Sequence, residues 1–300
     1  MSFEKNILGN KKIIDMLQKS YNAGKLSHAY LFEGPDHIGK KTFALEFCKL
    51  VLGDSINDIE KNPDLIILRP DADKKQIIIE QIRELEKKLS LYPYSSKHKL
   101  AIIEKADMMT KAAANAILKT LEEPNKTTIL ILLTSNSGNL LDTIKSRCQI
   151  MKFLPVEKRI LEDFLSITIK DKLQRDKIME MSGCKPGKIV ELVRDSDKVK
   201  EISIAINIFS DILHKNNSEK LDYVETIAKK EPNEIVGLLN HYSFYFRKKM
   251  LEEIQGKGEV DKNKVLKIKD NIDLLNSVKG NILTKNINIK LALENLFLQI

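Results

Sequence analysis

The chain has 300 residues, of which 42% are hydrophobic and 31% charged, and its formal net charge is +8. This composition excludes global disorder, and the length predicts two or three domains. No apolar run approaches the roughly 18 residues of a membrane-spanning helix. The first residues also lack the apolar core of a signal peptide. We therefore expect a cytoplasmic protein that has no membrane partner.

The cysteine and histidine pattern argues against a metal centre. The three cysteines lie far apart in sequence, and neither a Cys-x-x-Cys pair nor a His-x-x-x-His pair occurs. We expect no metal ligands and no zinc. The excess positive charge lies mostly in residues 1–200, where it indicates either a polyanionic partner such as DNA or simply solvated Lys-rich helix faces.

The first fifty residues predict a phosphate-binding loop. Apolar residues recur at helical spacing over 7–26, and the short apolar run 28–32 is typical of a buried strand. The glycine-containing turn 33–39 then leads into a second helix that runs from Lys40 to Leu52. A strand, a glycine turn and a helix in this order form the context that a phosphate loop requires.

Strands and helices alternate over the rest of the first half. The patterns predict strands at 64–68, 99–104 and 127–134, with helices at 79–89 and 112–123 between them. Alternation of this kind favours a parallel sheet covered by helices, which is the α/β fold of P-loop NTPases.

Only helical patterns follow Pro155. Short helices are predicted at 160–169, 175–181 and 186–193. Longer ones are predicted at 202–213, 220–230, 232–254, 261–278 and 285–298. We therefore expect three domains, which are an α/β domain at 1–156, a small helical domain at 157–198 and an all-α domain at 199–300.

The predicted phosphate loop departs from its consensus at one position. Gly34, Gly39 and Lys40 match the Gly-x-x-x-x-Gly-Lys pattern, but Lys41 stands where a Ser or Thr hydroxyl normally binds Mg²⁺. Thr42 follows one residue later, which rotates it by about 100° around the helix. The loop backbone and Lys40 keep the groups that hold a phosphate, but metal binding is disfavoured.

Three segments carry a resemblance to a known family. They are LSHAYLFEGP at 26–35, ANAILKTLEEP at 114–124 and SRCQ at 146–149, and the late segment NIKLALENL at 288–296 adds to them. The chain resembles bacterial clamp-loader subunits, which are AAA+ proteins. The resemblance implies an AAA+ domain, a helical lid and an all-α collar that forms the oligomer. It also implies a hetero-pentamer with gamma/tau and delta subunits that loads a sliding clamp onto primer-template DNA.

The resemblance also assigns roles to residues. Glu104 takes the Walker B position, but Lys105 replaces the glutamate that activates water, and an ammonium is not a base at neutral pH. Ser135 and Asn136 fall at the position that senses the γ-phosphate, where we expect them to be structural. Arg147 is similar to the arginine finger that such subunits supply in trans. Lys188 falls near a second sensor position or is simply solvated.

These features lead to a preferred function and to alternatives. The preferred function is a non-hydrolysing subunit that requires no cofactor, binds ATP or ADP weakly at most, and supplies Arg147 to a neighbouring ATPase subunit. The first alternative is an active gamma/tau-type ATPase with an atypical phosphate loop. A nucleic-acid-binding AAA+ protein outside replication is the second, although no appended DNA-binding motif supports it.

Overall fold

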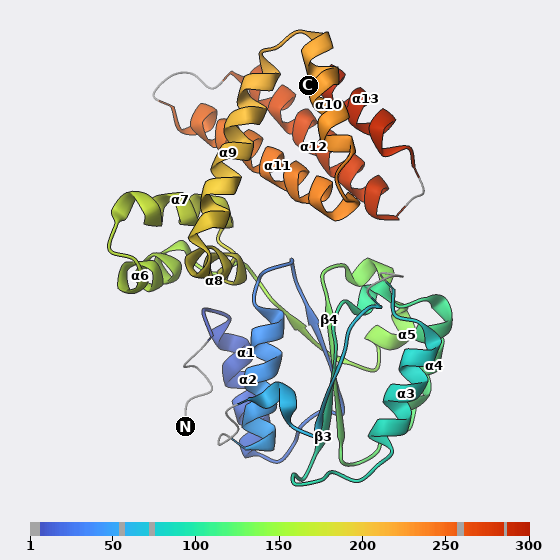
Figure 1. Ribbon diagram of the computed structural model, residues 1–300. Coiled ribbons are helices and arrows are strands. Elements are labelled where there is room, and N and C mark those ends of the chain that lie inside the picture. The colour runs from blue at the N-terminus through green and yellow to red at the C-terminus, as the bar shows by residue number, and fades with distance from the viewer. Residues whose placement is uncertain (1–6, 54–57, 72–75, 257–260, 285–286) are drawn as a thin grey trace. The chain divides into compact units, whose positions relative to one another are not determined.

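The structure is a computed structural model that describes residues 7–53, 58–71, 76–256, 261–284 and 287–300. The chain divides into two compact units, Met1–Val193 and Arg194–Ile300, and each unit has its own hydrophobic core (Figure 1). Most of the segment 157–198, which was expected to form a separate lid, is therefore grouped with the first unit. The three-domain division stays a prediction.

The first unit is built on a five-stranded parallel sheet with the spatial order β2-β3-β4-β1-β5. The strands are β1 (Ala29–Glu33), β2 (Leu65–Leu68), β3 (Lys99–Ile103), β4 (Thr128–Thr134) and β5 (Gln149–Lys152). The parallel α/β fold predicted from sequence is confirmed. The edge strand β5 was not predicted.

Helices cover both faces of this sheet. They are α1 (Lys11–Asn22), α2 (Lys40–Leu52), α3 (Ile79–Leu89) and α4 (Lys111–Glu122). Side chains of a strand point alternately to its two faces, so Tyr30 and Phe32 of β1 pack with α1 and α2, whereas Ala29 and Leu31 pack with α3 and α4. Figure 1 shows the two pairs of helices on opposite sides of the sheet.

Because all five strands run in the same direction, the sheet has two chemically different edges. We call them the carboxyl edge, where the strands end, and the amino edge, where they begin. Segments that follow β1, β2, β3 and β4 meet at the carboxyl edge, whereas the segment that precedes β5 lies at the amino edge.

Short helical elements complete the first unit. The 3-10 helices are η1 (Ile59–Lys61), η2 (Ala106–Met108) and η3 (Ser137–Asn139), and the α-helices are α5 (Asp142–Lys145), α6 (Lys158–Thr168), α7 (Lys172–Ser182) and α8 (Pro186–Arg194). The backbone N–H of Gly187 donates to the carbonyl of His37 at 2.8 Å, and a Cβ at 187 would lie 2.7 Å from that oxygen. A glycine at 187 thus lets α8 approach the predicted phosphate loop.

A buried carboxylate organises the turn that precedes β3. Asp64 is fully buried and accepts backbone hydrogen bonds from Tyr94, Ser95 and Ser96. Burial alone would raise the pKa of Asp64, but these backbone donors hold it below its ordinary value. The turn that they fix leaves the rings of Tyr92 and Tyr94 exposed to solvent.

In its described residues the second unit contains helices joined by short loops, and no strand. Its helices are α9 (Ser196–Leu213), α10 (Asn217–Ala228), α11 (Pro232–Gln255), α12 (Lys262–Thr284) and α13 (Ile289–Gln299). The all-α prediction is confirmed, although Lys285, where the last helix was expected to begin, lies outside the described residues. Phe209 stacks on Tyr242 with ring centroids 3.8 Å apart, and the Tyr242 and Tyr223 hydroxyls lie 2.6 Å apart.

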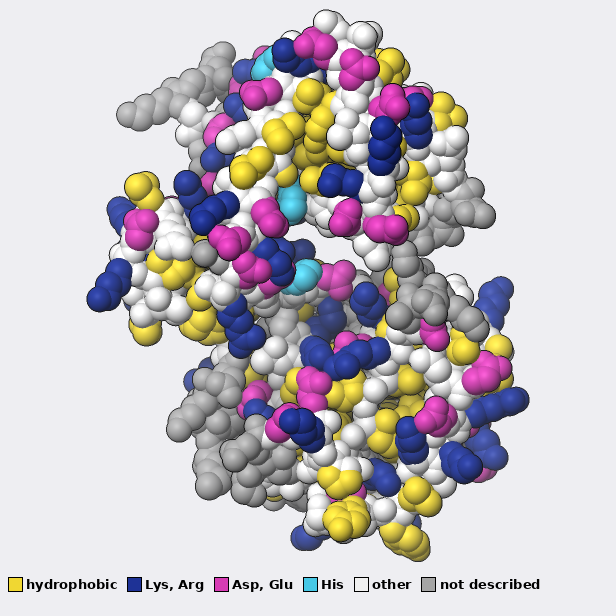
Figure 2. Space-filling view, viewed as in Figure 1, with side chains coloured by type: hydrophobic (Ala, Val, Ile, Leu, Met, Phe, Trp, Pro, Cys, Tyr) yellow, Lys and Arg dark blue, Asp and Glu magenta, His cyan; other side chains and the backbone are white. Residues whose placement is uncertain are grey.

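The described surface carries mixed charges. On the face shown in Figure 2, Lys and Arg side chains are interspersed with Asp and Glu. This pattern favours the solvated-helix explanation of the net charge for that face over a continuous basic stripe. None of the helices in the described part of the chain combines the length and the apolar character that crossing a bilayer requires.

Candidate functional site

The turn between β1 and α2 keeps the glycine framework of a phosphate loop. Gly39 directly precedes Lys40, the first residue of α2, and has a φ of +95°, in the region that favours glycine. Gly34 follows β1, and a Cβ there would lie 2.7 Å from the carbonyl oxygen of Phe153. Backbone geometry therefore requires both glycines.

A cavity of about 280 Å³ lies at the carboxyl edge beside this loop. The loop, the start of α2 and the segments that follow β3 and β4 line it, together with Gly187 of α8. It brings together these predicted site residues: Gly39, Lys40, Thr42, Glu104 and Ser135. The structure thus assembles most of the predicted nucleotide site in one place.

The predicted phosphate-binding lysine is directed toward its own loop. Lys40 is buried, and its ammonium donates to the carbonyl of Gly34 and, at 2.8 Å, to that of Pro35. Burial lowers the pKa of Lys40, and the nearby carboxylates of Asp36 and Asp107 counteract this effect. A phosphate at this site would have to displace the two carbonyl contacts before it could bind the ammonium.

Glu104, the predicted Walker B carboxylate, is held by two cations of the same chain. The Lys41 ammonium lies 3.1 Å from Glu104 Oε1, and Nε of Arg69 donates to the same oxygen at 3.0 Å. Glu60 closes the network, since it lies 3.5 Å from Lys41 and 3.1 Å from Arg69. Four side chains thus form a continuous ion-pair network at the metal position of the predicted site.

These residues do not fit the Mg²⁺ ion that a P-loop fold implies. The loop position that should offer a hydroxyl offers an ammonium, and Glu104 already contacts two cations. Mg²⁺ binds through oxygen ligands in a near-octahedral geometry, and neighbouring positive charges oppose it. Among the described residues, no group of three or more His, Cys, Asp or Glu side chains is placed to hold a metal.

Neither Thr42 nor Lys105 supplies the groups that ATP hydrolysis requires at this site. Thr42 lines the cavity but is exposed, one residue further around α2 than the missing hydroxyl. Lys105 is also exposed, with a φ of +52° at the end of β3, and it offers an ammonium where a general base is needed.

The predicted γ-phosphate sensor residues make structural contacts. The side chain of Asn136 accepts from the backbone N–H of Gly138 and caps η3. The backbone N–H of Ser135 donates to Asp107 at 3.3 Å, and the Thr134 hydroxyl donates to the same carboxylate oxygen at 2.8 Å. These contacts support the structural role expected for Ser135 and Asn136, which stays a prediction.

Lys188 pairs within its own helix. Its ammonium donates to Glu191 at 3.1 Å, and Glu191 also lies 3.7 Å from Nδ1 of His37 in the phosphate loop. Partial burial lowers the pKa of His37, the positive charge of Lys188 lowers it further, and Glu191 acts in the opposite direction. In the described chain, Lys188 thus lies in a small charge cluster that joins α8 to the loop.

Arg147 lies at the opposite edge of the sheet. It precedes β5, whose first residue, Gln149, pairs with Tyr30 near the start of β1. The phosphate loop begins at Gly34, four residues further along β1, which corresponds to about 13 Å along a strand. Arg147 therefore does not reach the nucleotide cavity of its own chain.

Three neighbours hold the Arg147 guanidinium at the amino edge. Nη1 donates to the carbonyl of Thr143 at 3.1 Å and to the Ser146 hydroxyl at 3.3 Å. Nη2 lies 2.8 Å from Oε1 of Glu122, the last residue of α4. The guanidinium is therefore anchored, while the side chain stays 35% exposed.

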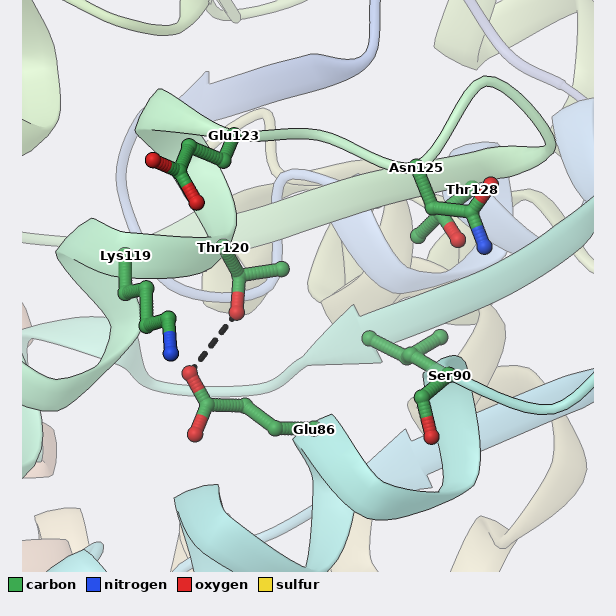
Figure 3. A pocket seen from close by; sticks show the side chains of 8 residues that line it. Glu86, Ser90, Lys119, Thr120, Glu123, Asn125 and Thr128 are labelled. Carbon is green, nitrogen blue, oxygen red and sulfur yellow. Dashed lines mark hydrogen bonds between the residues drawn. The ribbon is translucent and has the colours of Figure 1, made fainter.

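A second cavity, of about 220 Å³, also lies at the amino edge. Figure 3 shows it between the ends of α3 and α4, where the Thr120 hydroxyl donates to Glu86 at 2.7 Å. Lys119, Glu123 and Thr128 are among the other residues that line it. None of the predicted site residues lies in this cavity, so it is separate from the nucleotide site.

Sequence reasoning missed several residues that shape the site. Arg69 directly follows β2 and Glu104 directly follows β3, and the two strands pair Leu68 with Ile103. The rule that parallel strands end at one edge was therefore enough to place Arg69 at the same edge as Glu104, and the pairing of β2 with β3 brings the two together. No comparable signal identified Glu60, which lies in η1 between α2 and β2.

The fold and the site together define a class of protein. A parallel sheet in the order β2-β3-β4-β1-β5, with a glycine loop after β1 and a helical segment after β5, is the P-loop NTPase domain of AAA+ proteins. The solved structure of a DNA polymerase III gamma subunit-related protein from Thermotoga maritima is similar to this chain, with a TM-score of 0.56 and 20% identity over 94% of this chain and 97% of that one. That likeness supports the fold.

Sequence comparison identifies the family. The family model described as "DNA polymerase III, delta subunit" matches residues 9–157. The chain is 32% identical over 227 residues to DNA polymerase III subunit delta' of Bacillus subtilis, which covers 71% of this chain and 68% of the relative. It is 27% identical over 282 residues to DNA polymerase III subunit gamma of Buchnera aphidicola, which covers 88% and 71%. The chain belongs to the DNA polymerase III clamp-loader family, and within it to the delta-prime subunits.

Proposed function

We propose that this chain is a largely non-hydrolysing subunit of the clamp loader that supplies Arg147 to the nucleotide of a neighbouring ATPase subunit. The observation that carries the proposal is the contact of Lys41 with Glu104, at 3.1 Å, where a catalytic Mg²⁺ site requires a hydroxyl and a free carboxylate. Family membership supports the setting, and the position of Arg147 at the amino edge supports action in trans.

The chemistry of the proposed role is charge stabilisation. A transferring phosphoryl group carries negative charge in its transition state, and a guanidinium that contacts it stabilises that charge. Arginine suits this task because its charge is fixed and its N–H groups form a planar fork that matches phosphate oxygens. An arginine finger supplied in trans is worth about 10³–10⁵ in rate where it has been isolated.

The proposed partners follow from the family. We propose a hetero-pentamer with gamma/tau and delta subunits that acts in the cytoplasm on a sliding clamp and primer-template DNA. Within it, this chain requires no cofactor of its own and no zinc. The intact glycine framework around Gly39 and the presence of Lys40 remain compatible with weak binding of ATP or ADP.

The experiment is a reconstitution with the gamma/tau-type and delta subunits of the same organism, followed by measurement of DNA-stimulated ATP hydrolysis. Arg147→Ala should lower the turnover by at least about tenfold, while the complex still elutes intact from a sizing column. Arg159→Ala, which removes an exposed arginine from α6, is the matched control and should leave turnover unchanged. Normal turnover in the Arg147→Ala complex contradicts the proposal.

The alternative is a gamma/tau-type ATPase, and the gamma subunit of Buchnera aphidicola found by sequence comparison keeps it in consideration. The purified chain alone distinguishes the two functions. The proposed function predicts negligible ATP hydrolysis with Mg²⁺ present. Intrinsic turnover that disappears in Lys40→Ala would establish the alternative instead.

A further inference from the structure

The Arg147 guanidinium is held by residues from two segments that are distant in sequence. Thr143 lies in α5 and Ser146 directly follows this helix, whereas Glu122 is the last residue of α4. Nη1 hydrogen bonds to Thr143 and Ser146, and Nη2 lies 2.8 Å from Glu122. We call Glu122, Thr143 and Ser146 the Arg147 cradle.

The cradle stands on rigid elements. The N-terminus of α4 is capped by Thr110, whose hydroxyl oxygen accepts from the backbone N–H of Ala113 at 3.2 Å. Ile117 and Leu121 of α4 are buried in the core, and so is Ile144 of α5. Groups on packed elements keep their positions better than groups on loops. The cradle can therefore fix the direction of the guanidinium.

Glu122 is poorly placed for the helix that carries it. A helix C-terminus bears a partial negative charge, so a carboxylate in the last turn is electrostatically unfavourable for the helix. Glu122 and Glu123 both occupy this end of α4. A residue that is unfavourable for its own helix is expected where it has a functional role. For Glu122, the short contact with Arg147 indicates such a role.

The guanidinium also keeps donors for a ligand. Its five N–H groups are shared among Nε, Nη1 and Nη2. In the described chain Nη1 donates to Thr143 and Ser146, and Nη2 contacts Glu122 at 2.8 Å. The N–H of Nε and the second N–H of Nη2 face no such partner there, and an oxyanion can meet them. Glu122 thus holds the guanidinium at one nitrogen and leaves Nε for a ligand.

We propose that Glu122 is a positioning residue for Arg147, which it holds in the orientation that meets a phosphate of the neighbouring subunit. This inference rests on the proposed function of Arg147, and it adds a residue whose role is to aim that side chain. Glu123 is its natural comparison. It directly follows Glu122 at the C-cap of α4 and lines the second cavity, as Figure 3 shows, and in the described chain no ion pair joins it to Arg147.

The experiment compares Glu122→Ala with Glu123→Ala in the reconstituted complex, with turnover measured over a range of ATP concentrations. Glu122→Ala should lower kcat by about 5- to 10-fold, because a small misplacement of a catalytic group has a large effect on rate, and it should leave KM within about twofold. Glu123→Ala should leave both constants within about twofold. Glu122→Asp, which keeps the charge, should recover part of the lost kcat.

A double variant separates positioning from a general effect on α4. If Glu122 acts through Arg147, adding Glu122→Ala to Arg147→Ala should cause no further loss of kcat. A further loss equal to that of Glu122→Ala alone would overturn the inference, as would an unchanged or increased kcat in the Glu122→Ala variant. Because Arg147→Ala is measured in the same series, failure of the proposed function shows separately as normal turnover in that variant.

Discussion

The two edges of the sheet use the same ion-pair chemistry with opposite results. At the carboxyl edge, Lys41 and Arg69 both contact Glu104, so the charges of the predicted nucleotide site neutralise one another. At the amino edge, Arg147 meets the single carboxylate of Glu122 at Nη2, while Nε makes no such contact in the described chain. Two cations on one carboxylate oppose the binding of a metal ion, whereas we propose that one carboxylate beside a guanidinium fixes its direction.

This difference indicates that a match to a motif does not by itself make a working site. The glycines at 34 and 39 keep the phosphate loop in shape, yet Lys40 contacts the carbonyls of its own loop. Arg147 belongs to a shorter motif, and its side chain is 35% exposed. We therefore propose a structural role for the carboxyl edge and a chemical role for the amino edge.

The largest expected effect concerns the rigidity of the amino edge. Asp64→Ala leaves the backbone donors of Tyr94, Ser95 and Ser96 without their buried acceptor and should lower the free energy of unfolding by about 2–4 kcal/mol. Urea denaturation measures this change in the free energy of unfolding. The control Asp197→Ala removes an exposed carboxylate of α9 and should cost less than about 0.5 kcal/mol. An equal, small loss in both variants would show that the turn does not depend on Asp64.

The same carboxylate predicts a pH dependence. Because the pKa of Asp64 is lower in the folded protein than in the unfolded chain, its stabilisation is complete above the unfolded value, near pH 3.9, and is lost as the pH falls through the folded value. Asp64→Asn should therefore reduce the acid sensitivity of the unfolding free energy below about pH 4. Identical pH profiles for the variant and the natural protein would contradict this assignment.

A smaller effect should follow from opening the carboxyl edge. The double variant Lys41→Thr/Arg69→Ala removes both cations from Glu104 and restores a hydroxyl at the metal position. It should bind a fluorescent ADP analogue at least about tenfold more tightly with Mg²⁺ than with EDTA, a difference of about 1.4 kcal/mol. The natural sequence should show no such Mg²⁺ dependence. If the double variant binds the analogue equally well with Mg²⁺ and with EDTA, the ion-pair network is not what excludes the metal.

The smallest effect is expected for the contribution of the ion-pair network around Glu104 to the free energy of unfolding. Its side chains are 20–51% exposed, and exposed ion pairs contribute about 0–1 kcal/mol because solvent screens them. Arg69→Ala should therefore lower the unfolding free energy by less than about 1 kcal/mol, as measured by thermal denaturation. A loss of several kcal/mol would mean that the network holds the fold together rather than closing a site.

Much of the fold followed from local patterns. The strands from β1 to β4 are runs of apolar residues, and β1, β3 and β4 are largely buried, so each strand was found from sequence. The edge strand β5 was missed because it has four residues and buries only Met151, which gives no period to detect. The short helix α5 was also missed, since four residues carry no helical repeat.

The site was predicted less evenly. The loss of the metal ligand followed directly from Lys41, and the rule that parallel strands end at one edge was enough to place Arg69 at the edge of Glu104. The contact between Glu122 and Arg147 was not, because it depends on how α4 packs against α5 across 25 positions of sequence. Side-chain contacts between separate elements can be identified only from the structure, whereas the chemical type of each position can be identified from the sequence.

The most direct test compares the two edges in one complex. DNA-stimulated ATP turnover is measured for reconstituted clamp loaders that contain this chain with Lys40→Ala at the carboxyl edge or Arg147→Ala at the amino edge. The account predicts that Lys40→Ala leaves turnover near that of the natural complex, while Arg147→Ala lowers it by at least about tenfold. Loss of turnover with Lys40→Ala and normal turnover with Arg147→Ala would contradict it.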